Sequence, residues 1–406
     1  MKSETMKSPE NNGAELAAAL AQAAEGRGIE REAALLLYAK ASTEELLRIA
    51  GEVRARGKGS VVSFSKKVFI PLTTLCRDYC SYCTFRKDPG EPGASFMTPE
   101  EVLALAETGR QAGCKEALFS LGDQPERIFP EAREFLRQQG FSRTLDYAAA
   151  MCELVLERTG LLPHANPGVM DRAALERFRA SNASVGLMLE NVSPRLMRDG
   201  GPHAKAPDKV PALRLRTIEE AGKLSMAFTT GILIGIGETP EERVDSLLAI
   251  RDLHRRYGHV QEVIVQNFRA KPEIPMAGHP DPTLEEMLRT VAIARLVLGG
   301  EMNLQAPPNL SYEDFPRLLE TGINDWGGIS PVTRDFINPE AAWPQIALLR
   351  KETEARGFQL RERLALYPEY LARAEFLAPA VRRRALSLAD EKGYAREDAV
   401  AVPVAP

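Results

Sequence analysis

Residues 76–83 of this chain read Cys76-Arg77-Asp78-Tyr79-Cys80-Ser81-Tyr82-Cys83, and they closely follow the apolar run Val68-Phe69-Ile70-Pro71-Leu72. Three thiolates on one short loop can hold three corners of a four-iron cluster, which normally takes four cysteines. One iron then keeps an open coordination position, and such a position distinguishes a catalytic metal site from a closed structural one. We therefore expect Cys76, Cys80 and Cys83 to bind a catalytic [4Fe–4S] cluster.

A zinc site or a chance grouping of core cysteines fits this loop less well. A zinc site would need a fourth ligand, but neither Cys114 nor Cys152 lies at a zinc-finger spacing and no histidine lies near the loop. Three unrelated core cysteines would rarely fall at this spacing in a chain with only five cysteines. The aromatic neighbours suit a cluster, because Tyr79, Tyr82 and Phe85 would shield it from water.

The composition limits the remaining possibilities. Of the 406 residues, 44% are hydrophobic and 27% charged, which is typical of a folded chain. The net charge of -4 gives no basic footprint, so we expect no nucleic acid and no membrane surface as partner. No apolar run approaches the roughly 20 residues that span a bilayer, and the N-terminus lacks the apolar core of a signal peptide. An odd number of cysteines, three of them clustered, does not indicate a disulfide framework, so we expect a cytoplasmic protein with reduced thiols.

From residue 59 onward, short apolar runs alternate with amphipathic helical patterns. Strands are predicted over residues 67–71, 116–121, 161–164, 184–189, 226–234, 262–266, 302–305 and, weakly, 325–329. Helices are predicted over residues 100–112, 144–159, 172–180, 209–221, 240–257, 284–298 and 314–320. Thr98 and Thr239 mark two helix starts, because each is followed by proline and then, three residues after the threonine, by glutamate. This rhythm over roughly 270 residues matches a (β/α)8 barrel, although a doubly wound open sheet would show the same alternation.

Helical patterns flank the alternating region on both sides. Ser42 and Glu45 have the spacing of a capping box before one of them. We therefore expect a helical N-terminal extension over residues 1–58, the barrel over residues 59–335 and a helical C-terminal extension over residues 336–406.

Two further motif-like segments follow the cysteine loop in the sequence. Thr230-Gly231-Ile232-Leu233-Ile234-Gly235-Ile236-Gly237-Glu238-Thr239 ends the fifth predicted strand, and Ser120-Leu121-Gly122-Asp123 ends the second. Together with the loop they resemble the motifs of the radical S-adenosylmethionine (SAM) superfamily, although its usual Gly-Gly-Glu is here Leu-Gly-Asp. The resemblance implies a TIM-type barrel of the radical SAM kind, with a [4Fe–4S] cluster and S-adenosyl-L-methionine as cofactors.

More segments resemble one family within it, the first subunits of 7,8-didemethyl-8-hydroxy-5-deazariboflavin synthase. They lie at residues 69–78, 80–85, 116–126, 162–168, 186–190, 262–271, 303–309 and 326–331, and the resemblance spans about residues 33–356. The Cys-Arg-Asp entry and the Cys-Thr-Phe exit of the loop favour this family over its sister subunit, which couples tyrosine to the pyrimidine. The chain length also disfavours a fused form that carries both halves.

The resemblance implies a lyase of coenzyme F420 biosynthesis. Its substrate would be 5-amino-5-(4-hydroxybenzyl)-6-(D-ribitylimino)-5,6-dihydrouracil, converted to the deazaflavin with release of ammonia, methionine and 5′-deoxyadenosine. Its partners would be the sister radical SAM subunit and an electron donor such as ferredoxin or flavodoxin. The alternatives are the tyrosine-coupling sister subunit, a quinone-pathway cyclase of the same superfamily, or a non-catalytic iron–sulfur or zinc scaffold.

Strand ends in a barrel point into the active site, which together with the resemblance indicates cofactor-binding residues. Asp123 could accept a hydrogen bond from the cofactor's ammonium or cap a helix. Glu190 could bind the ribose hydroxyls or the methionyl amine, or form a surface salt bridge. Arg214 could hold the methionyl carboxylate, with Arg216 as its rival and a solvated helix face as the alternative. The other candidates are Tyr82 in the cysteine loop, Ser120 in the second-strand motif, and Gly235 and Gly237, where the backbone would approach the adenine.

Polar side chains near other strand ends are candidate substrate contacts. Amides and an imidazole suit a uracil edge and a ribityl chain, which offer donors and acceptors but little charge. Each alone could instead cap a backbone group. These candidates are His164, Asn166, Gln266, Asn267 and Asn309. Cys114 and Cys152 lie in helical patterns, and we expect both to be small core residues.

Overall fold

A computed structural model describes residues 9–403, and the strands in this part of the chain form one parallel sheet. The order is β2-β3-β4-β5-β6-β7-β8-β1, and β1 pairs with β2 as well as with β8. Eight strands therefore close into the predicted barrel, and the open-sheet alternative is wrong. Their bounds are β1 (Val61–Thr73), β2 (Glu116–Leu121), β3 (Leu162–Asn166), β4 (Ser184–Gly186), β5 (Phe228–Ile234), β6 (Val260–Asn267), β7 (Leu304–Gln305) and β8 (Asp325–Ile329).

A further strand, β9 (Gln359–Arg363), lies beside the barrel and pairs in parallel with residues 61–65 of β1. The sequence predicts only helix after residue 336, so β9 corrects that expectation. Its charges resemble a solvated helix face in the sequence, but each has a partner in the structure. Arg361 pairs with Asp390, Glu362 with Lys115, and Arg363 with Asp325.

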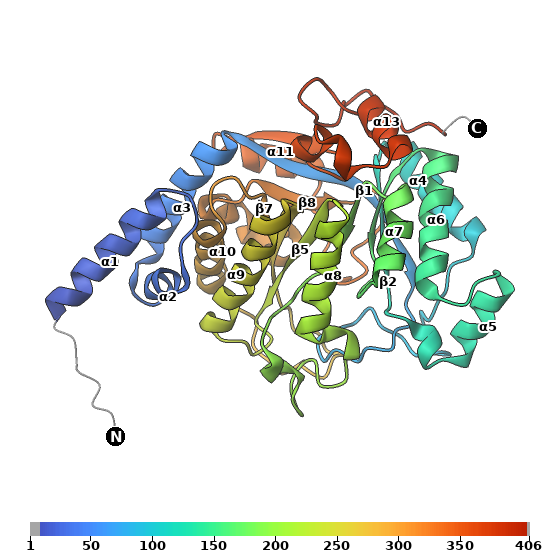
Figure 1. Ribbon diagram of the computed structural model, residues 1–406, viewed down its shortest axis with the longest axis horizontal. Helices are drawn as coiled ribbons and strands as arrows, with labels where there is room; N and C mark the ends of the chain where they lie inside the picture. The colour runs from blue at the N-terminus through green and yellow to red at the C-terminus, as the bar shows by residue number, and fades with distance from the viewer. Residues whose placement is uncertain (1–8, 404–406) are drawn as a thin grey trace.

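Helices form the outer layer around the strands (Figure 1). Those that follow strands are α4 (Pro99–Gln111), α5 (Pro130–Gln138), α6 (Thr144–Thr159), α7 (Arg172–Ser181), α8 (Pro211–Lys223), α9 (Pro240–Tyr257) and α10 (Leu284–Leu298). Thr98 and Thr239 begin α4 and α9 with complete capping boxes, as predicted. The sequence does not predict α5. The helix expected at residues 314–320 is a 3-10 segment, η4 (Pro308–Thr321), because Pro316 inside it has no N–H to donate.

Helices also flank the barrel in sequence. Before it come α1 (Pro9–Ala24), α2 (Arg31–Lys40) and α3 (Thr43–Lys58), and after it α11 (Ile346–Glu354), α12 (Pro368–Leu371) and α13 (Pro379–Leu388). Apolar residues of α2 and α3 belong to the same core as the strands, and Ser42 caps α3 with Glu45 as predicted. In Figure 1 the C-terminal segment lies over the upper end of the barrel, whereas α5 lies at the lower end. Residues 1–8 and 404–406 of the predicted extensions lie outside the described residues.

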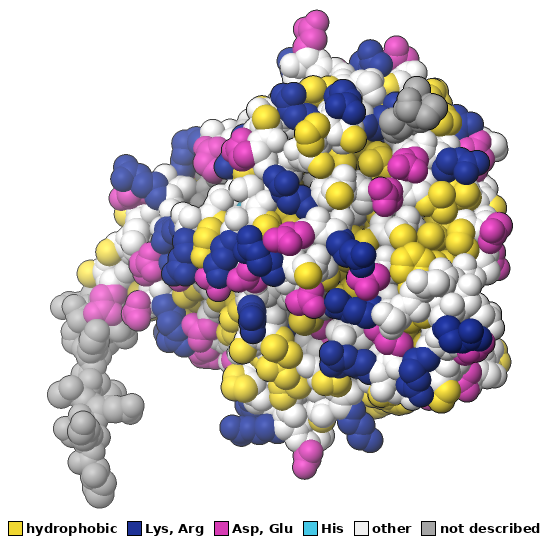
Figure 2. Space-filling view, turned by 45° about the vertical axis from the view of Figure 1, so that its right-hand side comes forward, with side chains coloured by type: hydrophobic (Ala, Val, Ile, Leu, Met, Phe, Trp, Pro, Cys, Tyr) yellow, Lys and Arg dark blue, Asp and Glu magenta, His cyan; other side chains and the backbone are white. Residues whose placement is uncertain are grey.

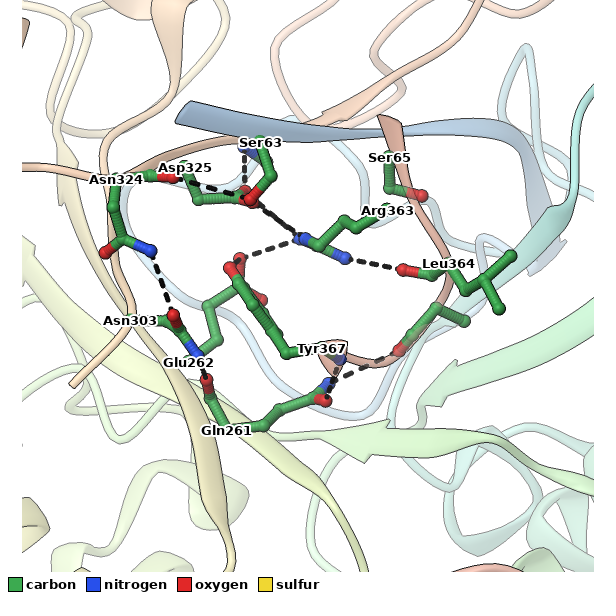
Figure 3. Close-up of polar contacts among 12 residues, drawn as sticks. Ser63, Ser65, Gln261, Glu262, Asn303, Asn324, Asp325, Arg363, Leu364 and Tyr367 are labelled. Atoms are coloured by element: carbon green, nitrogen blue, oxygen red, sulfur yellow. Dashed lines mark hydrogen bonds and ion pairs between the residues drawn. The ribbon is translucent and has the colours of Figure 1, made fainter. Parts of the chain in front are cut away.

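The C-terminal segment closes the amino-terminal end of the barrel through a buried polar network (Figure 3). Arg363 donates from Nε to Asp325 Oδ2 at 2.8 Å and from Nη2 to Glu262 Oε1 at 2.9 Å. Tyr367 Oη donates to the same Glu262 oxygen at 3.0 Å. Because Asp325 begins β8 and Glu262 lies near the start of β6, this network forms the floor of the barrel. The functional site is therefore expected at the opposite, carboxyl ends of the strands.

The surface is mixed in charge. Figure 2 shows basic and acidic side chains interspersed over the face in view, as the near balance of 52 Lys and Arg with 56 Asp and Glu predicts. No helix within the described residues is long and apolar enough to cross a membrane.

Candidate active site

A cavity of about 230 Å³ lies at the carboxyl ends of the strands. The loop between β1 and α4 carries the cysteines into its wall, and the segments after β2 and β4 add carboxylates. The predicted site residues in this wall are Cys76, Cys80, Tyr82, Cys83, Ser120, Asp123, Asn166, Glu190, Arg214, Gln266 and Asn267. The fold thus brings most of the predicted residues together in one place, which we call the cluster cavity.

The three clustered cysteines are free thiols, each partly exposed. Cys76 Sγ accepts backbone N–H bonds from Asp78 at 3.3 Å and from Asp123 at 3.1 Å. Such donors stabilise a sulfur that carries negative charge. Burial raises the pKa of Cys76 and of Cys80, so these thiols keep their protons until a metal replaces them. Soft ligands with backbone donors aimed at one of them fit an iron–sulfur cluster.

The other two cysteines lie elsewhere. Cys152 is fully buried in α6, as predicted. Cys114 is also buried, but it lies in the turn between α4 and β2 and not in a helix. Neither lines the cluster cavity, so both are core residues.

The packing around Gly122 explains why the second-strand motif has a glycine at this position. A β-carbon at this position would lie 2.0 Å from the Leu75 carbonyl oxygen and 2.6 Å from Cys76 Cβ. The cysteine loop can therefore lie against the end of β2 only because residue 122 has no side chain.

Three buried carboxylates, Asp78, Asp123 and Asp208, offer oxygens within 4.8 Å of one another in the cavity wall. Burial, and next the charge of Asp208, raises the pKa of Asp78 to about 6 and that of Asp123 to about 7. Arg77 pairs with Asp123, and Arg214 Nη1 donates to Asp208 Oδ2 at 2.7 Å. Asp123 does not cap a helix, because the next helical turn begins after Gln124. Its contact with a cofactor stays a prediction.

Glu190 follows β4 with a left-handed backbone, φ 63°. Strain of this kind in a residue with a side chain is concentrated at functional sites. Its carboxylate accepts from Lys209 Nζ at 2.8 Å and lies 3.9 Å from Arg214, and it is buried, so it is not part of a surface salt bridge. Arg214 is buried and donates from Nε to the Met188 carbonyl at 2.7 Å. Its rival Arg216 is exposed on the outer side of α8, so of these two arginines only Arg214 lines the cavity.

Tyr82 and Ser120 both lie in the cavity wall. Tyr82 Oη is 2.9 Å from His203 Nε2. Burial lowers the pKa of His203 to about 2, so its ring stays neutral. Its Nε2 can then accept a hydrogen bond from the Tyr82 hydroxyl. This contact fixes the tyrosine ring beside the cysteines without a charge.

Gly235 and Gly237 do not line the cluster cavity. A β-carbon at Gly235 would lie 2.2 Å from Pro282 Cγ, and its N–H donates to Glu238 at 2.8 Å. Gly237 instead lies at a surface groove beside Arg195. Packing of the loop accounts for Gly235 without a ligand, and the approach of this backbone to an adenine stays a prediction.

A second cavity, of about 170 Å³, occupies the interior of the barrel between the cluster cavity and the floor. We call it the interior cavity. The residues common to both walls are Ser120, Asn166, Leu187, Met188, Gln266, Ile337 and Asn338. His164 and Asn309 lie in the interior cavity alone, and Asn267 in the cluster cavity alone. Within the described part of the chain, Oδ1 of Asn267 and of Asn309 are buried acceptors without a partner, and such atoms usually indicate a ligand or water.

The hydrogen bonds of His164 define its tautomer. The Ser184 hydroxyl donates to the Ala365 carbonyl, which can only accept. It must therefore accept from His164 Nδ1, 2.6 Å away, which leaves Nε2 as an acceptor. Burial lowers the pKa of His164 to about 4, so the ring is neutral. A β-carbon at Gly186 would lie 3.0 Å from Nε2, so this glycine leaves room over the imidazole.

Several charged residues of the site were not predicted from the sequence. Asp78 lies within the cysteine motif, where only the cysteines and the tyrosines were assigned a function. Asp208 and Lys209 lie in a short 3-10 turn before α8, and Lys209 was expected only at the start of the helix predicted over residues 209–221. Lys67 lies in the interior cavity. The signal that could have identified it is its place as the one charged residue of the strand predicted over residues 67–71.

Comparison with known sequences shows the family of this chain. A model of the radical SAM superfamily matches residues 70–250. The 7,8-didemethyl-8-hydroxy-5-deazariboflavin synthase of Methanopyrus kandleri is 51% identical over 339 residues, which are 83% of this chain and 100% of that protein. The FO synthase of Streptomyces coelicolor is 50% identical over 94% of this chain and 46% of that protein. The chain thus spans about half the length of the FO synthases that it matches.

Solved structures agree on the fold. Methylornithine synthase superposes with a TM-score of 0.66 at 20% identity, over 84% of this chain and 97% of that chain. The [FeFe]-hydrogenase maturase HydG superposes with a TM-score of 0.69 at 15% identity, over 87% of this chain and 80% of that chain. At such identities the likeness shows a shared barrel and nothing about substrate.

Proposed function

Because this chain belongs to the 7,8-didemethyl-8-hydroxy-5-deazariboflavin synthase family within the radical SAM superfamily, we propose that it is the lyase that closes the deazaflavin ring of coenzyme F420. The substrate is 5-amino-5-(4-hydroxybenzyl)-6-(D-ribitylimino)-5,6-dihydrouracil, and ammonia, methionine and 5′-deoxyadenosine are released. One observation carries the proposal: the cluster cavity adjoins an interior cavity lined by amides and a neutral imidazole.

The residues of the cluster cavity fit the cofactors of this superfamily. Cys76, Cys80 and Cys83 would hold a [4Fe–4S] cluster. When bound, the cluster and S-adenosyl-L-methionine supply the one-electron chemistry that removes a hydrogen atom from the substrate. Arg214 offers a planar fork for a carboxylate, and the carboxylates around Asp123 suit an ammonium.

The interior cavity suits the substrate's polar groups. Asn166 and Gln266 line both cavities, so they would hold the reacting part of the substrate beside the cofactor. His164 Nε2 and Asn309 Oδ1 are acceptors that can receive hydrogen bonds from ring N–H groups or ribityl hydroxyls. The floor network closes the far end of the barrel, which limits the entry of water to a reactive intermediate.

We also propose the partners. We propose that the tyrosine-derived adduct comes from the sister radical SAM subunit, whose half of the FO synthase lies outside the 46% of the Streptomyces protein that this chain matches. A ferredoxin or a flavodoxin would deliver the electron.

An anaerobic product assay after cluster reconstitution tests the proposed function. The preformed adduct should yield fluorescent deazaflavin together with 5′-deoxyadenosine. Free tyrosine with 5-amino-6-ribitylaminouracil should yield neither unless the sister subunit is present. Abundant 5′-deoxyadenosine from tyrosine alone, without deazaflavin from the adduct, would assign this chain to the tyrosine-coupling reaction instead.

A further inference from the structure

Lys67 is a charged residue that the proposed function leaves without a role. It lies on β1 opposite Glu116 of β2, and its side chain lines the interior cavity. Among the described side chains, Lys67 Nζ has no hydrogen-bond or ion-pair partner, and it lies 5.7 Å from the centroid of the Trp343 ring. An ammonium that lines a cavity without a hydrogen-bonded anion is rare in a folded chain, because its removal from water is costly.

The barrel makes room for this side chain. A β-carbon at Gly328 would lie 2.1 Å from Lys67 Cε and 2.2 Å from Nζ. Any side chain at position 328 would therefore displace the amine. Gly328 of β8 therefore leaves the space through which the Lys67 side chain extends into the interior cavity.

Carboxylates surround the ammonium, but each is bonded elsewhere. Glu116 accepts from Ser65, Glu262 from Arg363, and Asp335 from Asn309 at 3.0 Å. The other groups that face Lys67 across the cavity are the neutral His164 and the cationic Arg363. The remaining buried lysines of the site have partners of their own: Lys209 pairs with Glu190, and Lys271 donates to Asn338.

Burial lowers the pKa of Lys67, and the charges of Glu116 and Asp335 oppose this shift. These carboxylates favour the protonated amine without using its three donors. Lys67 is thus a charged donor that faces the interior cavity with its hydrogen-bonding capacity unused.

We propose that Lys67 donates a hydrogen bond to a carbonyl oxygen of the pyrimidinedione ring of the substrate. This assignment rests on the proposed function. Of the polar groups on that substrate, the imide carbonyl oxygens are stronger hydrogen-bond acceptors than the ribityl hydroxyls or the phenol, because the ring nitrogen lone pairs delocalise onto them. A charged donor therefore gains most from the carbonyl. The adjacent ring N–H needs an acceptor, and Asn309 Oδ1 in the same cavity is an acceptor without a partner among the described residues.

The test compares Lys67→Gln with Lys66→Gln in the reconstituted protein. Successive residues of a strand point to opposite faces, so Lys66 is the matched control on the outer side of β1. Anaerobic calorimetry would measure the binding of 5-amino-6-ribitylaminouracil, of ribitol and of 4-hydroxybenzyl alcohol. We expect Lys67→Gln to weaken the binding of the ribityl-uracil about tenfold or more, with little change for the other two ligands, and Lys66→Gln to match the wild type.

A second measurement separates binding from folding. Because Lys67 has no hydrogen-bond partner to lose among the described residues, Lys67→Gln should melt at the wild-type temperature or higher, and its KM for the adduct should rise. Ribityl-uracil affinity within about twofold of the wild type, or a loss confined to ribitol or to the phenol, would overturn the assignment. A lowered melting temperature with unchanged KM would also overturn it.

The two proposals fail in different ways. If the wild type binds the ribityl-uracil through Lys67 but makes no deazaflavin from the adduct, the proposed function fails and the assignment of Lys67 stands. If the wild type makes deazaflavin and Lys67→Gln does so with unchanged KM, only the assignment fails.

Discussion

Single residues of this site carry charges and strain that a purely structural barrel would avoid. Glu190 holds a left-handed backbone, Asp78 and Asp123 have raised pKa values, and Lys67 is an enclosed cation. Each feature costs stability, and such costs are concentrated where binding or chemistry requires them. The strained and charged residues therefore indicate where the candidate site lies, independently of the sequence motifs.

The cysteines provide the first test at this scale. Replacing Cys76, Cys80 and Cys83 together by alanine should abolish iron and sulfide binding, because no described cysteine outside the loop lines the cluster cavity. Cys114→Ala and Cys152→Ala should keep full iron content and lose only about 1–3 kcal/mol of unfolding free energy, as buried core residues. Iron and sulfide analysis with Mössbauer spectra would decide. A cluster in the triple variant, or iron loss on changing Cys152, would contradict the ligand assignment.

His164 predicts a pH effect on stability. Its pKa falls from 6.5 in the unfolded chain to about 4 in the folded protein, because the ring is buried. The stability that the neutral ring contributes is complete above pH 6.5 and is lost as the pH falls toward 4, since the unfolded chain binds the proton first. When the pH falls from 7 to 5, the unfolding free energy of His164→Gln should therefore decrease by about 2 kcal/mol less than that of the wild type. Unfolding free energies at both pH values measure this, and equal losses in both proteins would contradict it.

At the scale of elements, the loops after strands build the site while β9 and the C-terminal chain close the other end. The floor network joins β1, β6, β8 and β9, four strands that are far apart in the sequence (Figure 3). Its charges are buried and mutually satisfied. Removing one partner would leave the others uncompensated.

Arg363→Met tests whether β9 fastens the barrel floor. The variant leaves the Asp325 and Glu262 carboxylates without their cation, so it should lose about 3–5 kcal/mol of unfolding free energy. Arg361→Met is the matched control on the same strand, because its ion pair with Asp390 is partly exposed and should contribute below about 1 kcal/mol. Denaturant unfolding of both variants gives the comparison. Similar losses in the two would show that the floor network does not hold the barrel together.

At the scale of the whole molecule, the proposed function assigns the cofactor to the cluster cavity and the substrate to the interior cavity. The cluster cavity contains the three cysteines with Asp78, Asp123 and Asp208, whereas the interior cavity contains His164, Asn309 and Lys67, and a shared wall joins them. The proposed reaction needs this adjacency, because a hydrogen atom is transferred only between groups in contact.

Two classes of variant should therefore behave differently. Asp123→Asn, Glu190→Gln or Arg214→Lys should lower 5′-deoxyadenosine formation itself by roughly 10–100-fold, since these residues line only the cluster cavity. His164→Gln, Asn166→Ala or Gln266→Ala should leave slow cofactor cleavage while deazaflavin is lost. Both products can be measured in one anaerobic reaction. If the two classes lost both products in parallel, the division between the cavities would be wrong.

Local patterns account for the elements that were predicted correctly. The bounds of α6, α9 and α10 were correct, because apolar periodicity and caps act within a few residues. The cysteine loop was recognisable because its ligands are close in the chain. The C-terminal extension was predicted to be helical only, and β9 contradicts this, because a charged strand with buried partners looks locally like a solvated helix face. The helix predicted over residues 314–320 is part of a 3-10 helix that contains Pro316.

The alternation along the chain predicted a barrel but left an open sheet as an alternative, the spacing of three cysteines predicted the cluster loop, and the resemblance of several segments gave the family. The fold was needed to show that Arg214 and not Arg216 faces the site, and that Asp78, Asp208 and Lys209 share it. The enclosure of Lys67 beside Gly328, without a partner among the described residues, likewise became visible only in three dimensions. The physical reason is that burial, pKa and the absence of a partner depend on residues that are distant in sequence and meet only when the barrel closes.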